Sequence, residues 1–157
     1  MPPKEELERM KDNALEMSSY YYKGFGNTFH GIIANAELSL TEPDRKDLSE
    51  NAYAWLNEIE QFYEKIPFEK LHGREEFYPL FVVKRLLPKF KETMDRVFVE
   101  KDKDALLDLQ TDSWTIVNVG RLYWDSFQMA LKYIRSDPEA KNFRVKITDY
   151  KGKDFHF

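Results

Sequence analysis

The sequence predicts an α+β protein that is mostly α, with a long helical hairpin in residues 1–70 and a small α/β unit in residues 71–157. Apolar residues recur at spacings of three and four over about the first sixty residues, which is the pattern of one face of an α-helix. Prolines then interrupt this pattern and divide it into separate elements. Two short stretches, residues 96–100 and 144–148, have the composition of β-strands.

The first helix is expected over residues 4–40, directly after two prolines that favour a helix start. Three glycines, Gly24, Gly26 and Gly31, each cost such a helix about 1 kcal/mol relative to alanine. Close approach of another backbone is the plainest use of the space they leave, and docking of a partner is the second. The apolar stripe of this helix consists of Leu7, Met10, Ala14, Met17, Tyr22, Phe25, Phe29, Ile32, Ala36 and Leu40.

The second helix carries the clearest apolar pattern in the chain and ends at Pro67. Its apolar seam is Leu48, Ala52, Trp55, Ile59, Phe62 and Ile66, which is a heptad-like series. Two paired helices still have apolar faces that something must cover. We predict a homodimer in which residues 4–66 of two copies form a four-helix bundle. The alternative is a monomer in which the hairpin folds onto the later helices.

Residues 71–157 are expected to alternate between helices and strands. A helix over residues 80–95 contains Pro88 and is followed by a strand over 96–100. A helix over residues 113–134 is apolar on several sides, which is typical of a helix deep in a fold. A strand over residues 144–148 then pairs, across a Lys-Gly turn, with residues 154–157.

Composition excludes several classes of function. The net charge is −4 with well-mixed charges, which does not favour nucleic-acid binding. The absence of cysteine excludes disulfides and thiolate chemistry. No apolar run is long enough for a membrane span, and the polar N-terminus is unlike a signal peptide. We therefore expect a cytoplasmic protein without a metal site or cofactor, because the sequence also lacks the common nucleotide-binding motifs.

Residues 25–40, FGNTFHGIIANAELSL, resemble the first dimerisation helix of two-component sensor histidine kinases. The relevant subgroup reads H-D-F-N-N-L-L-x-x-I-x-G-N-A-E-L. In this family two hairpins pair into a four-helix bundle. The phospho-accepting His of the family falls on Lys23, and the acidic residue after it falls on Gly24. The matching positions are Phe25, Asn27, Ile32, Asn35, Ala36, Glu37 and Leu38.

The second half of the chain resembles the start of the family's ATP-binding domain in the order of its elements. Its motifs differ, however. Depending on the register, RLYWDS (residues 121–126) or LYWDSF (residues 122–127) stands in place of the N-L-x-x-N-A box, with Asp125 or Ser126 at its second Asn. No D-x-G-x-G or glycine-rich ATP lid occurs. The resemblance therefore implies a truncated, degenerate ATPase-like unit, and a signal-transduction protein that lacks kinase chemistry.

The resemblance also implies a partner, the receiver domain of a response regulator, which would dock on the first helix. Lys23 could contact an acidic pocket such as the phosphorylation pocket of a receiver domain. His30, two turns after Lys23, is a candidate phospho-acceptor, which would make the protein a histidine phosphotransferase. The alternative is a helical protein-interaction module unrelated to phosphorelay. The predicted partner-binding residues are Lys23, Gly24, Phe25, Gly26, Asn27, Phe29, Gly31 and Ile33.

Overall fold

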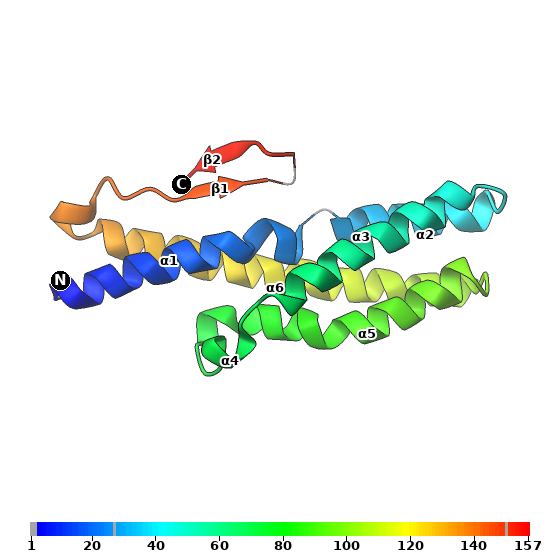
Figure 1. The fold of residues 1–157 in the computed structure, drawn as a ribbon, viewed down its shortest axis with the longest axis horizontal. Coiled ribbons are helices and arrows are strands. Elements are labelled where there is room, and N and C mark those ends of the chain that lie inside the picture. The colour runs from blue at the N-terminus through cyan, green and yellow to red at the C-terminus, as the bar shows by residue number, and fades with distance from the viewer. Residues whose placement is uncertain (1–2, 27, 150) are drawn as a thin grey trace.

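The computed structural model describes residues 3–26, 28–149 and 151–157 and shows a mostly helical α+β protein (Figure 1). Helices make up 78% of the described residues, which confirms the predicted dominance of helix over strand. The elements in chain order are α1 (Lys4–Phe25), α2 (Thr28–Thr41), α3 (Lys46–Glu64), α4 (Phe68–Leu71), η1 (Glu75–Phe77), α5 (Tyr78–Phe98), α6 (Lys103–Arg135), η2 (Pro138–Ala140), β1 (Lys146–Thr148) and β2 (Asp154–His156).

The expected single helix over residues 4–40 is two helices, α1 and α2. The break lies at Gly26, whose backbone is extended at φ −77° and ψ −178°. Asn27, at the same break, lies outside the described residues. A Cβ at Gly26 would overlap the carbonyl oxygen of Tyr22, so this conformation suits glycine. The prediction of one continuous helix was wrong because Gly26 marks a break between two helices.

The bundle forms within one chain. The α1–α2 segment, α3, α5 and α6 lie side by side, and α6 runs the whole length of the bundle (Figure 1). It packs on α5 and α2 in its first half and on α1 in its second half. The α3 seam is covered by this packing, and one hydrophobic core includes Ala52, Ile59 and Ile66 together with residues of α5 and α6. Later helices of the same chain therefore cover the seam that suggested pairing of two hairpins, and the homodimer itself stays a prediction.

Two buried tyrosines tie the helices to α1. The Tyr63 hydroxyl donates a hydrogen bond of 2.7 Å to the Gly24 carbonyl oxygen, and the Tyr123 hydroxyl donates one of 2.5 Å to that of Met17. Burial raises the pKa of both hydroxyls, so each remains a donor at ordinary pH. These bonds anchor α3 and α6 to the same helix and fix the position of its C-terminal half.

The predicted strand over residues 96–100 is wrong, because α5 continues to Phe98. Val97 and Phe98 are buried three and four residues after Met94, so they extend the buried face of a helix. Tertiary packing thus outweighs the β-propensity of this stretch. Pro88 lies inside α5 without ending it. After α4, the element order is therefore η1, α5, α6, η2, β1 and β2, and not the predicted alternation of helices and strands.

Helix α6 begins ten residues earlier than predicted. The Asp102 side chain caps it, accepting hydrogen bonds from the backbone N–H groups of Asp104 at 2.9 Å and Ala105 at 3.4 Å. Ala105 and Leu109 are buried, which extends the apolar face of the helix toward its N-terminus. The sequence pattern in this segment is short and interrupted by aspartates, so only the cap and the packing on α5 identify it as helix.

The predicted C-terminal hairpin is confirmed. Strands β1 and β2 pair antiparallel, with Ile147 opposite Phe155. The hairpin lies along α1 (Figure 1). The ring of Phe157 packs edge-on against Trp124 of α6 at 4.9 Å between centroids. This small sheet covers the outer side of α1 and α6 rather than forming a domain core.

Candidate functional site

Two of the predicted partner-binding residues, Gly24 and Phe29, are buried inside the chain. A Cβ on Gly24 would lie 3.1 Å from the Leu80 side chain. Phe29 packs edge-to-face on Phe90, with 5.5 Å between ring centroids. A partner cannot reach either residue in this fold, so both predictions are corrected. Phe29 belongs to the apolar stripe of the sequence, and α2 turns that stripe toward the core of its own chain.

The space beside the glycines is filled by aromatic side chains of the same chain. Gly31 faces the indole of Trp55, which a Cβ would approach to 3.2 Å. Phe25 packs on α6 at Gly120, where a Cβ would lie only 2.9 Å from the Phe25 Cβ. Its ring also contacts Tyr123 at 5.0 Å between centroids. Close approach explains these glycines, although aromatic rings make it rather than another backbone.

Lys23 lies on a different surface from His30. It lines a cavity of about 380 Å³ between α1, α3 and the turn of the hairpin, together with Glu58, Lys65 and Asp149. The remaining predicted residues, His30 and Ile33, lie on α2. The structure therefore separates the predicted site into a buried part, a cavity beside α3, and the outer face of α2.

His30 and Ile33 line a groove between α2 and α6 with a volume of about 530 Å³. They are three residues apart, so they lie on one face of α2. Phe29 and Ile32, each one position before these residues, are buried and hold this face outward. Residues at spacings of three and four supply the opposite wall from α6. These are Gln110, Ser113, Trp114, Val117 and Arg121. We call this groove the α2–α6 groove.

The α2–α6 groove combines a guanidinium, an imidazole and an indole group. His30 and Arg121 are both exposed, and neither forms a hydrogen bond or ion pair with another described residue. No carboxylate lines this groove among the residues that the structure describes. Trp114 is 65% exposed and offers a flat apolar surface beside them. Guanidinium and imidazole groups bind carboxylates and phosphates, so the groove suits an acidic or phosphorylated segment that also carries an apolar side chain.

The α6 wall was missed in the sequence. Trp114 was assigned to a helix apolar on several sides, and Arg121 to a stretch compared with a nucleotide-binding box. A usable signal was present, because Trp114, Val117 and Arg121 recur at helical spacing beside polar Gln110 and Ser113. The pairing of this face with His30 depends on tertiary contacts and could not be predicted.

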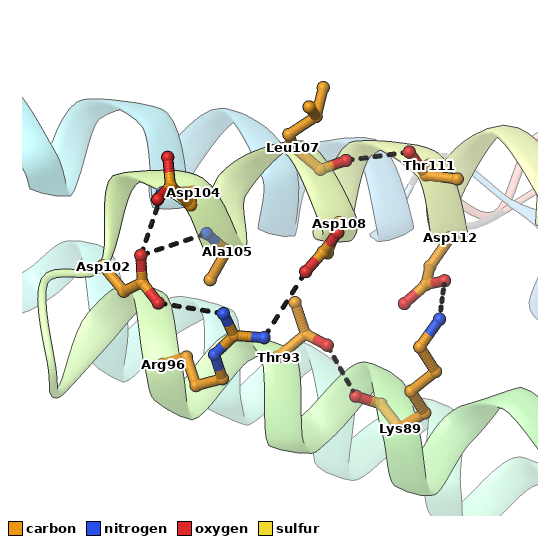
Figure 2. Close-up of polar contacts among 10 residues, drawn as sticks. All are labelled: Lys89, Thr93, Arg96, Asp102, Asp104, Ala105, Leu107, Asp108, Thr111 and Asp112. Atoms are coloured by element: carbon orange, nitrogen blue, oxygen red, sulfur yellow. Dashed lines mark hydrogen bonds and ion pairs between the residues drawn. The ribbon is translucent and has the colours of Figure 1, made fainter.

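The opposite flank of α6 carries a polar cluster of a different kind, formed by α5 and the first half of α6. Figure 2 shows Arg96 between two carboxylates, with Nη2 2.9 Å from Asp102 and Nη1 3.4 Å from Asp108. Lys89 reaches the Asp112 carboxylate at 3.1 Å. The hydrogen bond from Arg96 holds the pKa of Asp102 below its usual range. We call these five residues the α5–α6 cluster, and its charges are used to join the two helices.

Comparison with models of protein families, with curated proteins and with solved structures finds no match to this chain. Within the described residues, no helix is long and apolar enough to cross a membrane. No three His, Asp or Glu side chains of the described part of the chain come together as a metal site would require.

Proposed function

We propose that this protein is a binding module, without kinase chemistry, that docks a partner protein in the α2–α6 groove. The observation that carries the proposal is that His30 and Arg121 share an open groove with exposed Trp114, unpaired within the described chain and with no carboxylate lining it. A partner that inserts a carboxylate or phosphate beside an apolar side chain would pair with the Arg121 guanidinium and the His30 imidazole and cover the indole.

A receiver domain is the partner that the resemblance of residues 25–40 implies. Its acidic phosphorylation pocket has the charge that His30 and Arg121 would attract. The exposed imidazole also favours a second step, phosphoryl transfer. The unprotonated nitrogen of a neutral His30 imidazole would attack the phosphorus and form an N–P bond, while the Arg121 guanidinium binds the phosphoryl oxygens. The P–O bond to the receiver carboxylate that carried the phosphoryl group would break, that carboxylate would leave as an anion, and the other imidazole nitrogen would release its proton to water. Binding is the primary proposal, and transfer through His30 is its stronger form.

Binding can be tested by calorimetric titration with a panel of purified receiver domains. Arg121→Glu reverses the charge in the groove and is expected to weaken binding by about tenfold or more, which corresponds to about 1.4 kcal/mol. The matched control is Arg85→Glu. Arg85 is an exposed arginine that lines a separate cavity with His72 and Tyr78. Equal weakening by both substitutions would contradict docking in the groove.

Transfer can be tested with a receiver domain that carries a radioactive phosphoryl group. The wild type and His72→Ala are expected to acquire label, while His30→Ala is not. His72 is the matched control because it is exposed and lies outside the groove. Binding without label in any protein would leave the docking proposal and remove phosphoryl transfer. If no receiver domain binds but a helical peptide with acidic and apolar residues does, the alternative of an interaction module unrelated to phosphorelay is supported.

A further inference from the structure

A cavity of about 630 Å³ lies where α4 and η1 lead into α5 (Figure 1). Sites for small molecules commonly have volumes of about 300–1,000 Å³, so this cavity is large enough for one. Side chains from the segment between α4 and α5, and from the first two turns of α5, line it. The ones that matter here are His72, Glu75, Tyr78, Phe81 and Arg85. We call this space the α4–α5 cavity.

The α5 wall of the cavity presents two aromatic rings and a guanidinium on one face of a helix. Tyr78, Phe81 and Arg85 follow one another at spacings of three and four, which places them on the same face. Helical side chains lean toward the N-terminus of their helix, so Arg85 leans toward the two rings. Phe68 of α4 holds the Phe81 ring edge-on, with 4.8 Å between centroids. A ligand that joins an aromatic ring to an anion can therefore contact this face with both parts.

Three side chains of the α4–α5 cavity take no part in holding the fold. Tyr78 is 57% exposed, and His72 and Arg85 are exposed as well. None of the three side chains forms a hydrogen bond, ion pair or ring contact with another described residue. Arg74 differs, because its guanidinium reaches two carboxylates at 3.5 Å and lies over the ring of η1. Arg74 is thus a fixed part of the wall, whereas His72 and Arg85 keep their donors for a ligand.

The α4–α5 cavity also contains one carboxylate, that of exposed Glu75. This carboxylate pairs with no other described side chain, so it can accept hydrogen bonds from hydroxyl and amino groups. The guanidinium and imidazole groups suit a phosphate instead. The cavity therefore offers rings for stacking, donors for an anion and an acceptor for ligand donors. The α2–α6 groove, with one indole and no carboxylate among its described lining, lacks this combination.

We propose that the α4–α5 cavity binds a nucleoside monophosphate. The base would stack on Tyr78 and Phe81, and the phosphate would accept hydrogen bonds from Arg85 and His72. Ribose hydroxyls or an amino group of the base would donate to Glu75. Side chains, and not a glycine-rich loop, would hold the phosphate, so this site does not require the nucleotide-binding motifs that the sequence lacks.

Equilibrium dialysis with radiolabelled AMP tests this binding directly. AMP has about 23 non-hydrogen atoms, and at the efficiency usual for small ligands its dissociation constant should be on the order of 10 μM. Adenosine and inorganic phosphate each make only part of the contacts and should compete at least about tenfold more weakly. No binding of AMP up to about 1 mM, or competition by adenosine as strong as by AMP itself, would overturn the proposal. Tighter binding of phosphotyrosine than of AMP would point to a phosphopeptide and overturn the nucleotide as ligand.

Substitutions locate the site. Arg85→Ala and Tyr78→Ala should each weaken AMP binding about tenfold, because each removes one of the main contacts. The matched controls are Arg9→Ala, at an exposed arginine of α1, and Tyr133→Ala, at a tyrosine that is 52% exposed on α6. Both lie outside the cavity and should bind AMP as the wild type does. Circular dichroism should show the same helix content in all four variants. Full AMP binding by Arg85→Ala and Tyr78→Ala, or equal weakening by the controls, would contradict the site.

The α4–α5 cavity and the α2–α6 groove can be tested separately. Loss of AMP binding in Arg121→Glu but not in Arg85→Glu would place the nucleotide in the groove and overturn this proposal. The titrations with receiver domains contain no nucleotide, so Arg85 and His72 still serve there as controls outside the groove. A failure of one proposal therefore leaves the other standing.

Discussion

The two flanks of α6 use their charges in opposite ways. On the α5 flank Lys89 pairs with Asp112, and Arg96 bridges Asp102 and Asp108 (Figure 2). On the α2 flank, by contrast, His30 and Arg121 face a groove without a partner among the described residues. Charges paired within the chain hold its helices in register. Charges left unpaired on a rigid helix remain available for a partner, which makes the α2 flank the functional candidate.

The contrast is strongest at Asp112, which shows what pairing achieves on the α5 flank. Its side chain is only 4% exposed, and its Oδ2 atom has no hydrogen-bond partner among the described residues. A buried carboxylate is costly unless it is paired, so the contact from Lys89 to Oδ1 carries the compensation. Lys89 itself is 63% exposed and would lose little if the contact were absent. The importance of this ion pair for stability therefore comes from the cost of burying the Asp112 carboxylate, and not from Lys89.

Removing the Lys89 side chain that pairs with Asp112 should have the largest effect on the free energy of unfolding. Lys89→Ala leaves the buried Asp112 carboxylate without a charged partner and should lower the free energy of unfolding by about 2 kcal/mol. Urea unfolding at pH 7 measures this loss. Lys91→Ala, an exposed lysine of α5, should change stability by less than about 0.5 kcal/mol. The double variant Lys89→Ala/Asp112→Leu removes the carboxylate as well and should recover most of the loss. No recovery would show that Lys89 stabilises the helix in another way.

An intermediate effect is expected at Arg96, and it should depend on pH. The Arg96 hydrogen bond lowers the folded-state pKa of Asp102, so its contribution is present above the unfolded pKa of about 4 and is lost as the pH falls through the lower folded value. Arg96→Ala should therefore be less stable than the wild type at pH 6, with the difference shrinking toward pH 3. Urea unfolding at a series of pH values tests this. A difference that is constant with pH would rule out the ion pair as its source.

The smallest effects are expected on the α2 flank. His30→Ala and Arg121→Ala remove side chains that hold no other described residue, so each should change the free energy of unfolding by less than about 0.5 kcal/mol. Arg121→Ala should nevertheless weaken binding in the groove, and His30→Ala should abolish phosphoryl transfer. Destabilisation as large as that of Lys89→Ala would mean that these residues support the fold, and the contrast between the two flanks would then fail.

Local patterns in the sequence were sufficient for the elements that such patterns control. The α3 seam, with Leu48, Ala52 and Ile59, was predicted because one strong helical period covers it. The C-terminal hairpin followed from alternation around a Lys-Gly turn, where Gly152 has the positive φ of +82° that favours glycine. The same reasoning failed at Val97 and Phe98, because β-propensity is weaker than burial on an existing helix face.

What covers the hairpin could only be decided by the tertiary structure. An apolar seam requires a cover but does not say whether α5, α6 or a second copy supplies it, because burial of apolar area has no direction. The α2–α6 groove also depends on how the helices pack. His30 and Arg121 lie far apart in the sequence and line one groove only because α6 packs along α2. The sequence by itself thus determined which faces are apolar, and the packing of α6 determined which of them remain open.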